Sequence, residues 1–115
     1  MFKVAVAAKS MNLPSMKVPD TAAYLADIHG SNDAEKTIVC GFFRMEAGKS
    51  LSYHYDYHEM KLIVEGEMII TDETGQSHHA KAGDVFYFEK GSDITFSSPT
   101  YGIGFFCGQR QWGEA

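Results

Sequence analysis

The sequence predicts an all-β fold, a sandwich or barrel of the jelly-roll kind, on three observations. The second half of the chain is rich in β-branched and aromatic residues. Its apolar runs are short, and Gly, Pro or Ser residues bound them at near-regular spacing. The length of 115 residues suits one hydrophobic core and is too short for two, so we expect a single domain over residues 1–115.

The predicted elements begin with a strand over residues 2–8 and a short helical turn over residues 20–27, where Asp20 is an N-cap candidate. Pro14 and Pro19 prevent regular structure between these two elements. Further strands are expected at residues 37–45, 60–64, 68–71, 85–88, 94–96 and 101–107, with a tight hairpin turn at Glu65-Gly66-Glu67 between 60–64 and 68–71.

Composition excludes some classes of function. The net charge of −5 and the pI near 5.4 argue against nucleic-acid binding, because no basic stripe is present to contact a phosphate backbone. No apolar run approaches the ~18 residues of a membrane span, and the first apolar run is shorter than a signal peptide requires. We therefore expect a cytoplasmic protein that contacts no membrane. Cys40 and Cys107 lie in apolar runs and are expected to be buried, reduced thiols.

The stretch from Gly48 to Gly66 concentrates the polar chemistry of the chain. Residues 54–59 read His-Tyr-Asp-Tyr-His-Glu, which places two imidazoles and two carboxylates within six positions. The segment from Gly83 to Gly91 repeats a pattern of turn, strand and turn. Together the two segments resemble the two sequence motifs of the cupin superfamily. The positions that match are Gly48, His54, Glu59 and Gly66 in the first motif, and Gly83 and Gly91 in the second.

The chain also departs from the cupin pattern. Ser52 and Ile94 stand where the family usually has its other two metal-binding histidines, and Glu89 replaces a proline. Residues 64–67, 80–85 and 90–96 resemble the EutQ-type cupins, in which the second-motif histidine is commonly absent. The resemblance covers about residues 36–108. It implies a cupin-type jelly-roll β-barrel with an internal pocket, here with a short helical turn near the N-terminus.

The resemblance further implies that His54 and Glu59 are metal ligands. They form only half a site, because a catalytic metal needs about three protein ligands and an open position. Asp56 and His58 are the nearest additional candidates. Mixed nitrogen and oxygen donors suit one divalent transition metal, Mn, Fe, Ni or Zn, without selecting among them.

Side-chain alternation places Lys61 on the same strand face as Glu59. If Glu59 points into the barrel, Lys61 does too, where it either binds an anionic substrate group or forms a structural ion pair with Glu59. Tyr53 and Ser52 are further candidates for substrate binding. Tyr87 is a candidate acid–base that would act together with Lys61.

Two hypotheses of function remain open from the sequence. The first is a metal-dependent enzyme that acts on a small polar metabolite in a catabolic pathway. The alternative, favoured by the missing histidines, is a metal-free small-molecule-binding or accessory cupin without catalytic activity. Whether the protein is an enzyme stays undecided. A homodimer is also expected, with the first strand and the segment around Trp112 as pairing surfaces.

Overall fold

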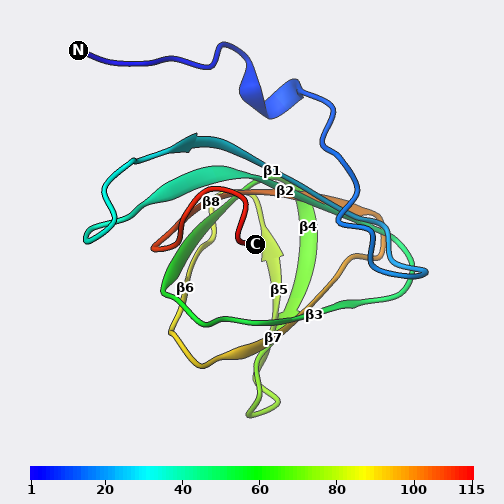
Figure 1. The fold of residues 1–115 in the computed structure, drawn as a ribbon. Coiled ribbons are helices and arrows are strands. Elements are labelled where there is room, and N and C mark those ends of the chain that lie inside the picture. The colour runs from blue at the N-terminus through cyan, green and yellow to red at the C-terminus, as the bar shows by residue number, and fades with distance from the viewer.

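Eight antiparallel strands form one sheet that curls into a barrel, in a computed structural model that describes all residues 1–115 (Figure 1). The prediction of an all-β barrel is therefore confirmed. One half of the sheet has the strand order β1-β2-β8-β4-β6, and the other has the order β5-β4-β7-β3. The strands are β1 Ala23–Gly30, β2 Val39–Glu46, β3 Leu51–His54, β4 Glu59–Thr71, β5 Ser77–Lys81, β6 Val85–Phe88, β7 Asp93–Ser97 and β8 Tyr101–Gly108.

Strand β4 joins the two half-sheets and shows that the predicted hairpin at residues 65–67 is wrong. Its first part pairs with β6 and β8, and its last part pairs with β5 and β7. The pairing register with β8 shifts between Ile63 and Glu65, which marks a bulge. Gly66 has φ of +69°, and a Cβ there would lie 2.2 Å from the carbonyl oxygen of Tyr101. The glycine thus lets the strand bend from one half-sheet to the other without ending.

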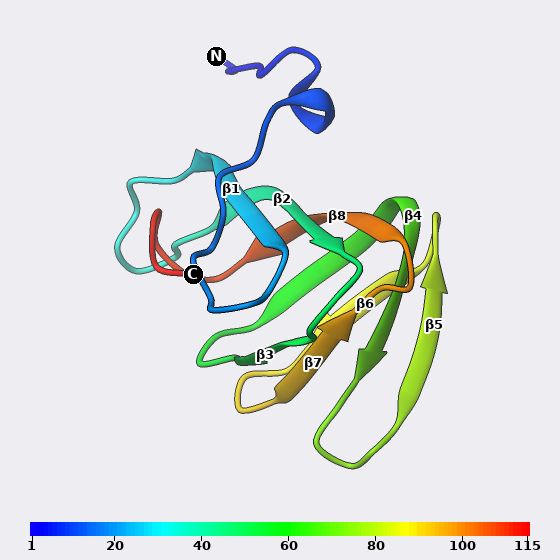
Figure 2. The same ribbon diagram turned by 90° about the vertical axis from the view of Figure 1, so that its right-hand side faces the viewer.

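The strand predicted over residues 2–8 and the helical turn predicted over residues 20–27 are also wrong, because the structure has neither element at those positions. Residues 23–30 form strand β1 and not a helix, because they pair with β2 along their length. The helical turn of the protein is a 3-10 turn at Ala8–Ser10. Residues 1–7, which we call the arm, pair with no strand, and all seven are exposed. Figures 1 and 2 show the arm standing off the barrel on the side of β1 and β2.

The other predicted strands are confirmed within about two residues, as β2, β6, β7 and β8. Strands β3 and β5 were not predicted. The sequence of β5, Ser-His-His-Ala-Lys, is polar and largely exposed, so it lacks the apolar alternation of a typical strand. The structure contains no helix with the length and apolar character that a membrane crossing requires.

The core lies between the two half-sheets. Strand β2 shows the underlying alternation most clearly, because every second residue from Val39 to Met45 is buried. Phe43 and Phe96 come from opposite half-sheets and meet edge to face, with ring centroids 5.2 Å apart. Around them pack the other fully buried large side chains, among them Phe106, Met45, Ile63 and Met68.

Candidate functional site

The candidate site lies in the interior of the barrel. Its residues follow from a simple alternation of inward-facing and outward-facing side chains. From Leu51 to Ile63, every odd-numbered residue is buried or half-buried, and every even-numbered residue is exposed. The pattern continues through the bend at residues 55–58 that joins β3 to β4. Glu59 and Lys61 are only 4% and 3% exposed, whereas Met60 between them is 51% exposed. The predicted inward orientation of Glu59 and Lys61 is therefore what the structure has.

Glu59 and Lys61 form an ion pair inside the barrel. The Lys61 Nζ lies 3.6 Å from Glu59 Oε2, and the Tyr55 hydroxyl donates a 2.5 Å hydrogen bond to the same oxygen. Burial raises the pKa of Tyr55 well above its ordinary value, and the nearby Glu59 carboxylate raises it further. Tyr55 therefore remains a hydrogen-bond donor at neutral pH. The two buried charges compensate each other, which is the condition under which ions are tolerated in a protein interior.

Three aromatic rings surround the Lys61 ammonium. Its Nζ lies 4.2 Å from the ring centroid of Phe96, 4.4 Å from that of Phe43 and 5.5 Å from that of Phe88. Such ring faces attract a cation, and the attraction is stronger where water is excluded. Burial lowers the pKa of Lys61, and the Glu59 carboxylate partly opposes this shift. The site thus holds one cation between a carboxylate and an aromatic cage.

A second buried ion pair lies at the mouth of the barrel. Arg110 donates two hydrogen bonds to Asp27, of 3.0 Å from Nη1 and 2.7 Å from Nη2. Burial raises the pKa of Asp27, but its hydrogen bonds to Arg110 and the backbone of Gly113 outweigh this effect and lower the pKa. The Nε of Arg110 is buried and has no hydrogen-bond partner. A buried cationic donor is therefore left free close to the barrel.

Residues 111–115, which we call the strap, fold back over this mouth. The Gly113 amide donates a 2.7 Å hydrogen bond to Asp27, and Trp112 packs against Gly30. Figure 1 shows the strap ending within the outline of the barrel opening. Ala115, together with Met16 and Leu25, helps to enclose a cavity of about 20 Å³ above the Glu59–Lys61 pair. That volume is room for about one water molecule.

The four metal-ligand candidates do not come together in the structure. Only Glu59 points into the barrel. His54 is exposed, and its Nδ1 lies 2.7 Å from the Asp93 carboxylate. His58 is exposed as well, with its Nδ1 3.0 Å from the Tyr87 hydroxyl, and Asp56 is exposed.

The remaining family positions supply no metal ligand either. Ser52 is exposed, and the aliphatic Ile94 is buried in the core. The structure contains no group of three or more His, Cys, Asp and Glu side chains that could hold a metal ion. The residues inside the barrel therefore do not fit the metal that the cupin resemblance implies, and the Lys61 ammonium is the cation beside Glu59.

The candidate catalytic pair is likewise divided between the two sides of the sheet. Tyr87 lies on the outer side of β6 and is 51% exposed, while Lys61 lies inside the barrel. Among the candidate substrate-binding residues, Ser52 faces outward. Tyr53 faces inward, and its hydroxyl is 2.8 Å from the hydroxyl of Tyr57. The barrel thus brings together Lys61 and Tyr53, without Tyr87 or Ser52.

Several residues of the site were missed from the sequence. Continuing the alternation backward from Glu59 would have found Tyr55 and Tyr57. The Asp27–Arg110 pair joins positions 83 residues apart, and no local pattern indicates it. The aromatic cage also comes from strands that are distant in sequence.

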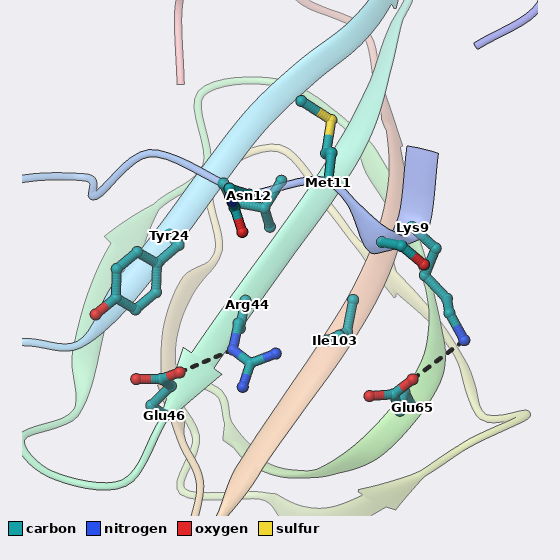
Figure 3. A pocket seen from close by; sticks show the side chains of 10 residues that line it. Lys9, Met11, Asn12, Tyr24, Arg44, Glu46, Glu65 and Ile103 are labelled. Carbon is teal, nitrogen blue, oxygen red and sulfur yellow. Dashed lines mark hydrogen bonds and ion pairs between the residues drawn. The ribbon is translucent and has the colours of Figure 1, made fainter. Parts of the chain in front are cut away.

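A larger hollow of about 560 Å³ lies on the outside of the barrel, between residues 9–13 and the sheet (Figure 3). Its charged side chains already pair with one another. Lys9 lies 3.1 Å from Glu65, and Arg44 lies 2.8 Å from Glu46. These pairs are substantially exposed, where ion pairs contribute little energy. We therefore place the candidate site in the barrel, where the charges are buried.

Comparison with known proteins agrees with this architecture. Residues 32–101 match the family described as "EutQ-like cupin domain". The chain is 44% identical over 76 residues to a protein named acetate kinase EutQ from Salmonella typhimurium LT2, covering 66% of this chain and 32% of that protein. It is 34% identical over 68 residues to the protein of the same name from Escherichia coli K12, covering 59% and 28%. The chain thus spans about a third of the length of these curated relatives.

Solved structures show the same fold. An ethanolamine utilization protein Q from Salmonella typhimurium LT2 superposes with a TM-score of 0.66 at 29% identity, covering 76% of this chain and 68% of that one. The Cnp3 cupin domain of Schizosaccharomyces pombe gives a TM-score of 0.73 at 15% identity, covering 94% and 70%. The cupin-type jelly-roll barrel expected from the sequence is therefore confirmed.

Proposed function

Because the chain belongs to the EutQ-like cupin domain family, we propose that it is a metal-free cupin that binds a small carboxylate inside its barrel. The observation that carries this proposal is the buried Lys61 ammonium, paired with Glu59 and enclosed by aromatic rings. In a barrel lined otherwise by apolar and tyrosine side chains, this ammonium is the group to which an anion is attracted. The alternative function inferred from the sequence is thus favoured over a metal-dependent enzyme.

The class of ligand follows from charge and size. A carboxylate ligand would compete with the Glu59 carboxylate for Lys61, while Tyr55 keeps its hydrogen bond to Glu59. Arg110, whose guanidinium carbon lies 5.7 Å from the ring centroid of the cavity residue Tyr57, adds positive charge near the mouth. The cavity of about 20 Å³ has room for about one water molecule, so we expect a ligand of only a few heavy atoms, such as acetate, for which the cavity must widen. The curated relatives are named acetate kinases, which supports this choice.

Met16 and Ala115 line the cavity at the mouth, so entry of a ligand larger than a water molecule requires them to move. The strap is held there by the hydrogen bond from Gly113 to Asp27 and by Trp112 on Gly30. These are few contacts, so the strap opens more readily than the barrel strands. We propose binding and not phosphoryl transfer, since the chain has no glycine-rich loop that would hold phosphates and spans only a third of the named kinases.

Thermal denaturation in the presence of EDTA tests the proposal. Acetate should raise the melting temperature of the protein, whereas acetamide, its neutral isostere, should not. Lys61→Met should abolish the acetate effect. Lys49→Met is the matched control, because Lys49 is exposed and lies outside the barrel, and it should respond to acetate like the unmodified protein.

Three results would contradict the proposal. The first is that neither acetate nor formate, glycolate or propionate stabilises the protein. The second is an acetate effect of the same size in Lys61→Met. The third is stabilisation that appears only after a divalent metal is added and disappears with EDTA, which would return the metal-dependent hypothesis to first place.

A further inference from the structure

Cys40 and Cys107 face each other across two neighbouring strands. Their Cα atoms are register partners in the antiparallel pair of β2 and β8, which runs without a shift from Val39 to Glu46. Figure 2 shows these two strands side by side. Both thiols are free and half-buried on the outward-facing side of the sheet, at positions 67 residues apart in the sequence. The fold thus brings together two thiols that are distant along the chain.

The hydrogen bond at the end of this strand pair defines how the two cysteines meet. In an antiparallel pair, opposed residues alternate between hydrogen-bonded and non-hydrogen-bonded positions. The amide of Ala47 donates a 2.9 Å hydrogen bond to the carbonyl oxygen of Thr100, one position beyond the Glu46 end of the register. Alternation back from this bond makes Cys40 and Cys107 a non-hydrogen-bonded pair. The Cα atoms of such pairs are only about 4.5 Å apart.

This arrangement suits a disulfide bond between the two strands. A disulfide requires Cα atoms roughly 4.4 to 6.8 Å apart and Cβ atoms that do not point away from each other. The side chains of a non-hydrogen-bonded pair point to the same side of the sheet and are the closest of all cross-strand pairs. The bond between Cys40 and Cys107 therefore needs no change in the pairing of β2 with β8.

An open hollow gives small molecules access to both thiols. Its volume is about 530 Å³, and Cys40, Cys107, His29 and Lys3 are among the residues that line it. Small-molecule sites have volumes of roughly 300 to 1,000 Å³. No carboxylate lines the hollow, and the Lys3 ammonium supplies a positive charge. A negatively charged reagent is therefore attracted to the side of the sheet on which the thiols lie.

We propose that Cys40 and Cys107 form a dithiol site that reduces small disulfides carrying carboxylates, such as glutathione disulfide, and that becomes a cross-strand disulfide in doing so. The Cys40 thiolate attacks one sulfur of the small disulfide, whose S–S bond breaks and releases one small thiolate. The Cys107 thiolate then attacks the Cys40 sulfur, and the second small thiolate leaves. The two cysteines are oxidised, the small disulfide is reduced, and the two protons lost by the cysteines pass to the two leaving thiolates.

The two cysteines have different roles in this reaction. Burial raises the pKa of the Cys107 thiol, and the nearby Cys40 and Glu59 raise it further. Less of Cys107 is therefore thiolate at neutral pH, so Cys40 reacts first. The second step is intramolecular, between groups held opposite each other, and it is much faster than attack by another free thiol. The mixed disulfide is therefore short-lived, and the internal disulfide accumulates.

Incubation of the reduced full chain with glutathione disulfide tests the proposal. The intact mass of the single chain should fall by two hydrogen atoms, Ellman's reagent should find no remaining thiol, and a digest should contain the Cys40 and Cys107 peptides linked. The bond should raise the melting temperature by on the order of 10 °C, because it closes a loop of 67 residues in the unfolded chain. Dithiothreitol should reverse each change.

Two variants separate direct opposition from the mere presence of thiols. Cys107→Ser should stop the reaction at the mixed disulfide, so that one glutathione stays bound to Cys40. Cys107→Ser combined with Phe105→Cys is the matched control, because it keeps two thiols on the same side of the same two strands. Such diagonal neighbours lie about 7–8 Å apart, beyond the Cα separation of about 7 Å that a disulfide spans. The control should also retain bound glutathione and form no internal disulfide.

The charge of the small disulfide is tested at Lys3. Lys3→Gln should slow the reaction with glutathione disulfide several-fold and should not slow the reaction with cystamine, a cationic disulfide. Lys90→Gln, at an exposed lysine outside the hollow, should change neither rate. Circular dichroism verifies that each variant is folded.

Four results would overturn the proposal. The first is that both thiols of the unmodified protein survive glutathione disulfide, and the second is that bound glutathione persists on it. The third is an internal disulfide that forms as readily in the Phe105→Cys control. The fourth is an unchanged rate with glutathione disulfide in Lys3→Gln, which would contradict the preference for an anionic disulfide.

Discussion

The two sides of strand β4 reverse the usual distribution of polar and apolar residues. Toward the interior, Glu59 and Lys61 place two ionised groups in the core. Toward the exterior, Met60 and Leu62 place two apolar side chains in water. Each arrangement is unfavourable for isolated residues. The difference between the two sides is that the interior groups have their partners within the chain, whereas the exterior ones do not.

This contrast separates two environments that lie one residue apart in the sequence. The interior is complete in one chain, since Tyr55, three aromatic rings and a mutual ion pair satisfy Glu59 and Lys61. The exterior side chains Met60 and Leu62 remain exposed and have no such partners within the chain. Because successive side chains of a strand point to opposite faces, the interior and the exterior of the barrel share strand β4 without sharing a residue.

The largest expected effect comes from breaking the interior pair. Glu59→Gln leaves the Lys61 ammonium buried without a counter-ion and should reduce the free energy of unfolding by about 3–5 kcal/mol. The loss should shrink as pH rises, because burial lowers the pKa of Lys61 and the neutral amine needs no counter-ion. Urea titrations at several pH values measure this.

Two further variants sharpen that result. Glu89→Gln removes an exposed carboxylate that makes no ion pair, and it should leave the stability unchanged. Glu59→Gln combined with Lys61→Met should recover most of the lost stability, because it removes both charges. Equal stabilities for Glu59→Gln and Glu89→Gln would show that the interior charges are solvated and that the contrast between the two sides is wrong.

The Asp27–Arg110 pair at the mouth should show a somewhat smaller effect. Asp27→Asn removes the carboxylate from a buried guanidinium, at a cost of about 3 kcal/mol. The pKa of Asp27 is lowered in the folded state, so the unfolded chain binds the proton more tightly. The contribution of this pair is therefore present above about pH 4, the unfolded pKa, and is lost as pH falls toward the folded pKa.

Acid denaturation, monitored by fluorescence, tests the predicted direction of this pH dependence of stability. Asp27→Asn should have a weaker pH dependence of stability below about pH 4 than the unmodified protein. Asp56→Asn, at an exposed carboxylate without a hydrogen-bond partner, should retain the original dependence. Identical acid profiles for the Asp27 variant and the unmodified protein would rule out a stabilising role for the pair.

The sequence predicted those parts of the fold in which local pattern and tertiary contacts agree. Residues 37–45 alternate, and they form β2 because both of its neighbours match that alternation. Residues 20–27 carry a helix-like composition, but pairing with β2 outweighs it and makes residues 23–27 part of β1. Residues 2–8 have strand character without a neighbouring strand, so within one chain no strand forms there. Gly66 has the local signature of a turn, whereas its close approach to Tyr101 makes it a bend inside β4.

The candidate site was likewise predicted only where a local pattern agrees with the tertiary contacts. Glu59 and Lys61 were placed correctly, because alternation within one strand is a local property. His54 was linked to Glu59 through the resemblance to cupins, yet the two positions differ by an odd number and face opposite sides here. Asp27 and Arg110 come together only through the closed barrel, so no pattern within a single strand contains this information.

The exposure of the outward-facing side of the sheet can be examined through the two natural cysteines. Cys40 and Cys107 lie opposite each other on β2 and β8, on the outward-facing side of the sheet. Both are free and half-buried, and burial raises the pKa of Cys107. If the homodimer expected from the sequence covers this side of the sheet, their rate of reaction with Ellman's reagent should fall several-fold between dilute and concentrated protein at one pH. A rate that is independent of protein concentration would count against such coverage.

The smallest expected effect is at His54, on the exposed side of the alternation. His54→Ala removes a hydrogen bond between two side chains that are both more than half exposed, so the free energy of unfolding should change by about 0.5 kcal/mol or less. Elemental analysis should find the same metal content in this variant as in the unmodified protein, since His54 does not face Glu59. A large loss of stability, or a loss of bound metal, would mean that His54 reaches the interior. In that case an even-numbered residue would contribute to the barrel site, and the separation of interior from exterior by side-chain alternation would fail.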